Sequence, residues 1–255
     1  MRSRHTCRFA LLATLVSILG AMLTGCSTVN EGGGTAAAPT TSVQTLEYYP
    51  YQVKGYQNSY PKKTIVILMP ADARDMTGNT APLNGNPAIG IVTDQPGSVT
   101  ERLYSPPLGP ILQQAIGRSA EEAGMSASPS TEVAYKPGVP EKAEYVLESK
   151  IRRCWVKKAR GANGQDGPVW RTMADVALTV SIYKPPFSVP FWTGSTNDTY
   201  YDPPVGSFGL GSEDEAGIYD EPGQVLSVAL TRAVAAIFQR QDLRNLMLED
   251  DVKSR

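Results

Sequence analysis

The most reactive side chains in this 255-residue chain are one histidine, His5, and three cysteines, Cys7, Cys26 and Cys154. An imidazole beside a serine or a cysteine can act as the general base of a hydrolase, and it can also bind zinc. His5 and Cys7 lie in a basic stretch that precedes an apolar N-terminal segment. The chemistry open to the chain therefore depends on whether that segment stays attached.

The N-terminal segment has the layout of a secretory signal. Residues 1–8 carry Arg2, Arg4 and Arg8 without an acidic residue, and an apolar stretch runs from residue 9 to about residue 23. This stretch is short for a membrane-spanning helix with its flanking anchors. The alternative is an N-terminal anchor helix that is never cleaved. Small residues before a cysteine that opens a polar, glycine-rich tract favour cleavage.

The sequence Leu23-Thr24-Gly25-Cys26 resembles a bacterial lipobox, where signal peptidase cuts between Gly25 and Cys26. The resemblance implies that the Cys26 sulfur carries diacylglycerol and that the new amino group is acylated, for example with palmitate. Two or more acyl chains hold a protein stably on a membrane, whereas one chain binds it marginally. Ser27 stands where an aspartate would retain a lipoprotein in the inner membrane. We therefore expect an outer-membrane anchor at Cys26 and a protein that faces the periplasm.

Cleavage before Cys26 would remove chemistry as well as length. His5 and Cys7 would be lost and Cys26 acylated, which leaves Cys154 as the single thiol. A mature chain without imidazole excludes serine or cysteine hydrolases that use histidine and zinc sites that contain it, and one thiol excludes an internal disulfide. The net charge would fall from −1 to about −4, which gives no basic field for nucleic acid. We expect no enzyme activity, metal, cofactor or nucleic-acid partner.

Asp72, Arg74 and Asp75 form the first candidate site, just after the apolar run 64–69. Loops that follow buried strands often carry function. Arg74 can pair with either carboxylate and fix the loop, or it can bind a ligand. The sequence leaves both interpretations open.

The densest group of basic residues lies between residues 150 and 160 and contains Trp155. A strand periodicity of two predicts Lys150, Arg152 and Lys158 on the face away from Trp155. These cations suit a solvated strand face. The functional alternative is contact with anionic lipid headgroups or with another acidic partner in the envelope.

Other polar groups are less specific. Glycosidases need two carboxylates and no histidine, and Glu148, Asp198 and Asp202 are nominal candidates whose spacing singles out no pair. The acidic loop at 211–221 offers oxygen ligands for calcium, but its spacing does not match an EF-hand. We expect Cys154 to be an unreactive thiol, with intermolecular pairing as the alternative.

Apolar periodicity predicts an α+β fold. The run 64–69 suits a buried strand, and the region from Ser105 to Gly124 has helical spacing between a proline-containing start and a glycine stop. Three more strands are expected at 145–158, 172–183 and 191–201, the last edge-like, followed by helices at about 224–239 and from Asp242 to 248. The order predicts a β-α-β-β-β-α sandwich, with a mostly antiparallel sheet of about four strands and two helices packed on one face.

We expect four segments: a signal peptide at 1–25, a lipidated cysteine and flexible tether at 26–62, a single domain at 63–248 and a tail at 249–255. Low complexity after Cys26 is typical of a flexible tether. The distal part of this tether contains Tyr48, Tyr49, Tyr51, Tyr56 and Tyr60. These tyrosines suit an extended arm that lies on the domain, or an aromatic recognition strip.

This element order, together with local sequence, resembles the YajG-like lipoproteins and, more loosely, the auxiliary lipoproteins of ABC-type lipid transport systems. The matching segments are Asp72-Ala73-Arg74-Asp75, Pro87-Ala88-Ile89-Gly90, Leu112-Gln113-Gln114-Ala115, Tyr145-Val146-Leu147-Glu148 and Gln241-Asp242-Leu243. The resemblance implies a non-enzymatic accessory or binding module that helps lipid transport or assembly in the cell envelope. The alternatives are a carboxylate-based hydrolase of envelope glycans and a purely structural lipoprotein.

Overall fold

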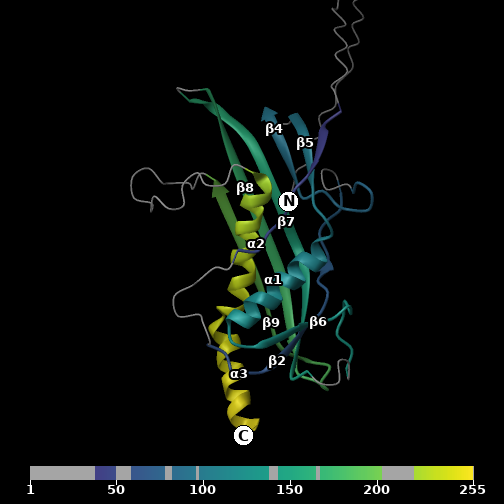
Figure 1. Cartoon of the computed structure of the whole chain (residues 1–255), viewed down its shortest axis with the longest axis vertical. Coiled ribbons are helices and arrows are strands. Elements are labelled where there is room, and N and C mark those ends of the chain that lie inside the picture. The colour runs from purple at the N-terminus through teal and green to yellow at the C-terminus, as the bar shows by residue number, and fades with distance from the viewer. Residues whose placement is uncertain are drawn as a thin grey trace, which may run out of the picture. The chain divides into compact units, whose positions relative to one another are not determined.

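The strand β7 (Tyr145–Gly164) is the centre of a nine-stranded mixed sheet in the computed structural model (Figure 1). The structure describes residues 38–49, 59–77, 82–95, 98–137, 143–164, 167–202 and 221–254. On one edge of β7, β8 (Gly167–Tyr183) and β9 (Pro190–Asp202) continue the sheet as an antiparallel meander. Apolar residues alternate along β8, so that one face of this meander is buried.

The other edge of β7 pairs with short parallel strands, one after another along its length. These are β2 (Thr64–Ile67), β3 (Ala71–Asp72) and β4 (Gly90–Gln95). Three further strands extend this side, namely β6 (Ser126–Pro129) on β2, β5 (Ser98–Tyr104) on β4 and β1 (Thr40–Val43) on β5. A single long strand therefore joins the meander to the parallel part of the sheet.

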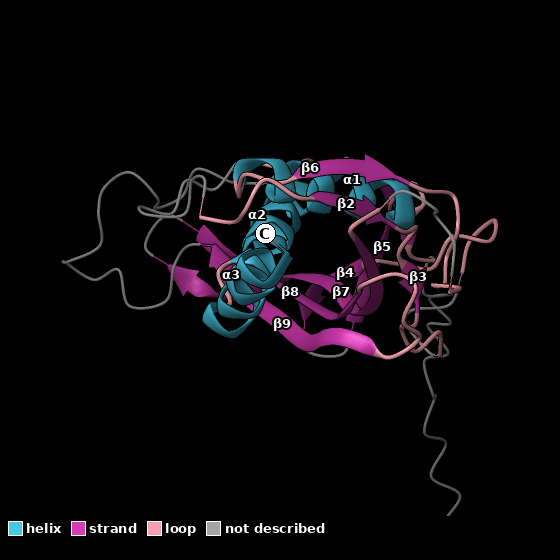
Figure 2. Ribbon diagram, turned by 90° about the horizontal axis from the view of Figure 1, so that it is seen from below, coloured by secondary structure: helices cyan, strands magenta, loops and turns pink. Residues whose placement is uncertain are grey.

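The helices lie on one side of β7, β8 and β9 (Figure 2). They are α1 (Leu108–Glu122), α2 (Pro222–Phe238) and α3 (Gln241–Ser254). Gly124 ends α1 with a φ of 101°, a left-handed conformation that favours glycine, and the Met125 N–H then donates to the Ala120 oxygen at 3.0 Å. Pro222 begins α2, where its missing N–H would have no helical partner in any case.

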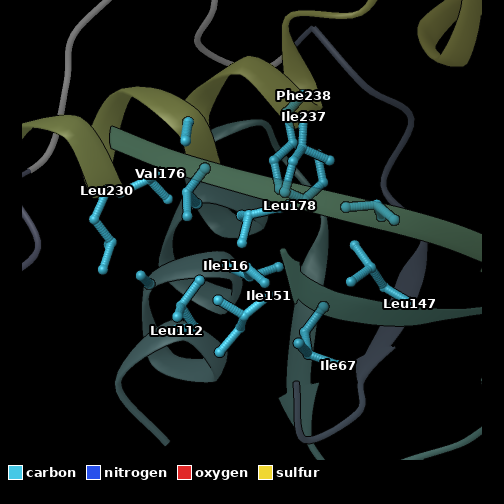
Figure 3. Packing of buried hydrophobic residues seen from close by; sticks show 14 of the residues in the cluster. Ile67, Leu112, Ile116, Leu147, Ile151, Val176, Leu178, Leu230, Ile237 and Phe238 are labelled. Atoms are coloured by element: carbon cyan, nitrogen blue, oxygen red, sulfur yellow. The ribbon is translucent and has the colours of Figure 1, made fainter. Parts of the chain in front are cut away.

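The core lies between the helices and the sheet (Figure 3). Leu112 and Ile116 of α1 and Leu230 of α2 are fully buried and pack with residues of β2, β7 and β8. Each fully buried side chain of this kind contributes about 1.5–3 kcal/mol. Packing therefore stabilises the side of the sheet that faces the helices. The opposite side takes no part in this core and can carry polar residues.

The predicted α+β class is confirmed, but the predicted sheet is wrong in size and direction. The sheet has nine strands instead of about four, and it is mixed because every partner on one edge of β7 is parallel. The last helix, expected from Asp242 to 248, is longer than predicted, since α3 extends to Ser254. The additional strands β1, β3 and β6 have only two to four residues and few apolar side chains, which explains why periodicity did not reveal them.

The folded unit also includes residues before 63. The segment after β1 lies along α2, where the Glu47 N–H donates to Ser227 Oγ at 2.8 Å and the Tyr49 N–H donates to Thr231 Oγ1 at 3.1 Å. The hydroxyl of Tyr60 donates to the Phe238 oxygen at 3.0 Å. These contacts favour the arm interpretation for the tyrosines that the structure describes.

Several predicted features lie outside the described residues. These are the signal peptide, the lipobox with Gly25 and Cys26, Tyr51, Tyr56, and the acidic loop up to residue 220. Among the helices of the described part of the chain, none is long and apolar enough to cross a membrane.

Candidate functional site

A β-bulge in the middle of β7 decides which side chains share a face. Ile151 is opposite Leu178 and Arg153 is opposite Ala177, so Arg152 is an extra residue without its own partner in β8. A bulge of this kind shifts the alternation of side chains by one residue. Before the bulge, Ile151 faces the helices; after it, Cys154 does so, and both side chains are buried.

The bulge brings most of the basic run to the side of the sheet away from the helices. We call this side of β7, β8 and β9 the outer face. Lys150 is opposite Thr179, Arg153 is opposite Ala177 and Trp155 is opposite Asp175, and these three β8 residues alternate with its buried residues. Arg152 belongs to the same face, because its Nε donates to Thr179 Oγ1 at 2.8 Å.

The predicted arrangement of Lys150, Arg152 and Lys158 away from Trp155 is therefore wrong. Trp155 shares the outer face with Lys150 and Arg152. Lys158 lies on the other side, because it is opposite the buried Thr172 and its Nζ is 6.0 Å from the centre of the Trp170 ring. A prediction that ignores the bulge and continues the period of two therefore assigns every later residue of β7 to the wrong face.

The outer face is rich in positive charge. Its exposed cations are Lys150, Arg152, Arg153, Lys157 and Arg171. Its two acids partly offset them, since Lys150 Nζ lies 3.7 Å from Glu148 and Arg153 Nε lies 2.9 Å from Asp175. In both pairs the cation is exposed and the acid is partly covered, so that water and salt screen the attraction in part. The cations from residue 150 to residue 157 extend over about 23 Å of strand.

Uncharged polar groups continue the outer face onto β9. Its exposed residues there are Thr193, Ser195, Asn197, Thr199 and Tyr201. At the other end, Tyr135 stacks on Tyr183 at 4.3 Å and its N–H donates to Glu148 at 2.9 Å, so a loop covers that end. Figure 2 shows the described helices on the opposite side of these strands. Beyond Glu148, the cations of β7 and the polar row on β9 are exposed.

Two residues of the first candidate site, Asp72 and Arg74, form a clamp in which the guanidinium is buried. Arg74 Nε donates to Asp72 Oδ1 at 2.9 Å and Nη2 donates to Oδ2 at 2.7 Å, while Nη1 donates to the main-chain oxygens of Ala88 and Cys154. Burial alone would raise the pKa of Asp72, but Arg74 outweighs burial and the pKa is lowered. Asp75 instead accepts the Thr77 N–H at 3.1 Å. Arg74 thus fixes the loop through Asp72.

A pocket of about 190 Å³ adjoins this clamp near the start of α1. Asp72, Arg74, Asn86 and Ser105 contribute its polar lining. The hydrogen bonds of Arg74 go to protein acceptors. Of the two interpretations of Arg74, the geometry favours the structural one.

The nominal catalytic acids do not converge. Glu148 lies on the outer face, whereas Asp198 and Asp202 point to the helix side of β9. Asp198 and Asp202 are four residues apart in an extended strand, which corresponds to about 13 Å, beyond the separation of a glycosidase pair. Burial raises the pKa of Asp198 and Arg232 partly opposes this effect. The three acids therefore do not form the predicted alternative site.

Cys154 is buried on the helix side of β7, opposite in direction to Trp155. Burial raises the pKa of its thiol to about 12. A buried, protonated thiol does not react readily and cannot reach a second chain. Within the described ranges, no group of three or more His, Cys, Asp or Glu side chains could hold a metal ion.

Sequence reasoning missed two parts of the outer face. Arg171 precedes the alternating run of β8, so no sequence pattern assigned it to a face of the sheet. The row on β9 was predicted as polar and edge-like, but its relation to the cations of β7 depends on the register of β8 between them. The bulge at Arg152 adds Arg153 and Lys157 to the face that Lys150 already shares with the row on β9.

No family model and no curated protein matches this chain. Among solved structures, protein XCC0632 of the DUF330 family model, from Xanthomonas campestris, is 12% identical, with 83% of this chain and 98% of that chain covered and a TM-score of 0.48. A Helicobacter pylori protein described as a candidate homolog of neuraminyllactose-binding hemagglutinin is 12% identical, with 81% and 98% covered and a TM-score of 0.42. Lipoprotein GNA1162 from Neisseria meningitidis is 13% identical, with 71% and 100% covered and a TM-score of 0.32. Likeness at this level assigns neither a family nor a function.

Proposed function

We propose that this chain is a non-enzymatic accessory or binding module of the bacterial cell envelope. In this proposal, acylated Cys26 anchors it to the outer membrane on the periplasmic side, and the outer face of β7–β9 binds anionic lipid headgroups or another acidic envelope component. The observation that carries the proposal is the open outer face, with five exposed cations and two acids. The finer resemblance to YajG-like lipoproteins remains part of the same proposal.

The physical basis is electrostatic. Several cations along one strand attract a surface or polymer whose negative charges are spaced over a similar length, and each lysine or arginine near an anionic membrane adds about 1 kcal/mol. Trp155 lies between the cations of β7 and is half-buried. Part of its ring is therefore exposed beside these positive charges. The attraction should weaken as salt increases, because the charges are exposed to solvent.

The absence of catalysis is likewise a proposal. Glu148, Asp198 and Asp202 do not converge, and Cys154 is buried with a raised pKa. These facts remove the candidates that the sequence offered for a hydrolase. They leave binding as the activity that the surface chemistry supports best.

A vesicle-tethering assay tests the anionic face. Full-length processed protein in one set of vesicles should capture a second, fluorescent set that contains phosphatidylglycerol more readily than a phosphatidylcholine set, and salt should reduce capture. The variant Lys150→Glu/Lys157→Glu should lose this preference. Lys253→Glu in α3 makes the same kind of charge change at an exposed residue away from the face and serves as the control. Equal capture of both vesicle types by the wild type would contradict binding to anionic lipid.

Crosslinking in cell envelopes separates a specific protein partner from a purely structural role. A crosslinker placed at Lys157 should recover a defined acidic partner in repeated experiments, and the charge-reversed double variant should lose it. Failure to recover such a partner, combined with no lipid preference, would favour the structural alternative.

The anchor has an independent test. Cys26→Ser should block acylation and cleavage, so the variant should keep residues 1–25 and run as a larger species. Normal maturation of this variant would contradict the lipobox interpretation, whatever the outer face binds.

A further inference from the structure

β9 is an edge strand of unusual length. It pairs with β8 over nearly all of its 13 residues, and no strand pairs with its other side in the part of the chain that the structure describes (Figure 1). Such an edge presents a row of main-chain N–H and C=O groups to which another strand can bind. The question is which strand fits it.

From Trp192 to Asp202 the edge lacks the features that usually prevent strand addition. Protected edges are short, carry lysine or an interior proline, or are twisted by bulges. β9 contains no lysine or arginine, and its only proline is its first residue, Pro190. Its register shift against β8 lies next to this proline, at Phe191, and the pairing is regular from Trp192 onward. The other edge strands differ, because β6 has four residues and ends at Pro129, and β1 also has four residues. β9 is therefore the long unprotected edge among the described strands.

The sequence of β9 is complementary to itself in the antiparallel direction. A two-fold axis at Thr196, the middle residue, pairs the residues from 192 to 200 of one copy with compatible residues of the other. On the outer face the pairs are Thr193 with Thr199 and Ser195 with Asn197; on the helix side they are Trp192 with Tyr200 and Gly194 with Asp198. Phe191 lies outside this pattern, because it is an extra residue in a bulge and packs against Tyr145. Aromatic pairs and pairs of threonines are favourable directly across strands, and like charges are not.

The charges of β9 also fit this pairing. Its two acids, Asp198 and Asp202, would lie opposite Gly194 and Pro190 of the second copy. No acid would then face another acid directly across the new ladder. A partner strand of any other protein would have to match this pattern by coincidence, whereas a second copy matches it by symmetry.

We propose that two copies of this chain associate through β9, antiparallel about Thr196, into one continuous sheet. Because the two-fold axis is perpendicular to the sheet, both outer faces lie on the same side. The basic rows on β7 of the two copies then face one direction, so a dimer would engage one anionic surface at two places. The association itself does not require the proposed anionic ligand.

Paired cysteines test both the contact and its register. In full-length protein within cell envelopes, Thr193→Cys/Thr199→Cys should give a disulfide-linked dimer on mild oxidation, because opposite residues are about 5 Å apart. Within one copy the two positions are six residues apart, about 20 Å along the strand, so they cannot bond to each other. Thr193→Cys alone and Thr199→Cys alone should stay monomeric, and the wild type controls for the native cysteines. A double variant that remains monomeric, or single variants that crosslink as well as the double variant, would overturn the proposal.

A second measurement does not depend on introduced thiols. Two differently tagged full-length copies should purify together from detergent, and Ser195→Lys/Asn197→Lys should abolish this by placing lysines opposite each other. Ala177→Lys, on the outer face of β8 away from the edge, is the control and should leave co-purification unchanged. Copies that still purify together with lysines on the β9 edge would overturn the assignment of β9.

Discussion

Arg74 lies side-on against Asp72, with Nε 2.9 Å from Oδ1 and Nη2 2.7 Å from Oδ2. The remaining nitrogen, Nη1, donates to the Cys154 oxygen at 3.2 Å and to the Ala88 oxygen at 3.4 Å. One side chain thus connects the end of β3, the approach to β4 and the middle of β7. The guanidinium is buried, whereas the Asp72 side chain is 31% exposed.

Removing this guanidinium should destabilise the fold. Arg74→Met leaves Asp72 without its cation and leaves two main-chain oxygens without a donor, so we expect the free energy of unfolding to fall by about 2–3 kcal/mol, less than for a fully buried pair. Urea unfolding followed by circular dichroism measures it. Asp75→Asn, at the exposed neighbour, should stay within about 0.5 kcal/mol. Equal stability of both variants would contradict the clamp.

Helix α3 is held to the sheet through two aspartates. Asp242 accepts hydrogen bonds from Arg240 and from Trp192 Nε1, each at 3.0 Å, and these bonds hold its pKa well below the usual range. Asp250 accepts from Lys184 and from the Tyr145 hydroxyl. Burial alone would raise the pKa of Asp250, but these two partners outweigh burial and lower it.

The docking of α3 should therefore weaken in acid. A carboxyl with a lowered folded-state pKa adds stability that is fully present above its unfolded pKa of about 3.9 and is lost as pH falls through the folded value. Hydrogen exchange in 241–254, corrected for intrinsic rates, should accelerate relative to α2 below about pH 4. Asp242→Asn/Asp250→Asn should already exchange faster at pH 6 and respond less to acid. Exchange in α3 that follows α2 at every pH would exclude this mechanism.

The sequence predicts the parts of the fold in which apolar periodicity is regular. α1, α2 and β8 each have one apolar side, and all three were predicted close to their observed bounds. β5 has two adjacent charged residues, Glu101 and Arg102, and no regular apolar alternation, and β6 has few apolar residues. Such strands exist because neighbouring strands pair with them, which no local pattern records.

For the outer face too, sequence periodicity alone gives the wrong arrangement, and one residue is responsible. The basic run on β7 is visible in the sequence, but the bulge at Arg152 decides that Lys150 and Trp155 share a face and that Lys158 does not. Nothing in the residues around Arg152 marks a bulge. The period of two can be applied on both sides of the bulge only when the register between β7 and β8 is known.

Two glycines should respond oppositely to alanine. A Cβ at Gly90 would lie 2.2 Å from the main-chain oxygen of Val156, where β4 pairs with β7, and backbone cannot move aside cheaply. We expect Gly90→Ala to cost about 1–3 kcal/mol. A Cβ at Gly117 in α1 meets nothing within 4 Å, so Gly117→Ala should gain about 0.5–1 kcal/mol from helix propensity. Thermal unfolding of the two variants measures both signs, and a shift in the same direction for both would contradict the packing described here.

The thiol of Cys154 should be unreactive until the protein unfolds. Burial raises its pKa to about 12, and Arg74 lies against the carbonyl of the same residue. At pH 8 the thiol would therefore be protonated, and the sulfur is covered as well. Maleimide should therefore label Cys154 in urea but not in the native protein, as assigned by peptide mass, with Cys154→Ser as the blank. Because Arg74 and Cys154 share this contact, Arg74→Met should make the native thiol label faster. Rapid labelling of the wild-type native protein would show that the strand opens at this point, and it would contradict a fixed clamp between β3 and β7.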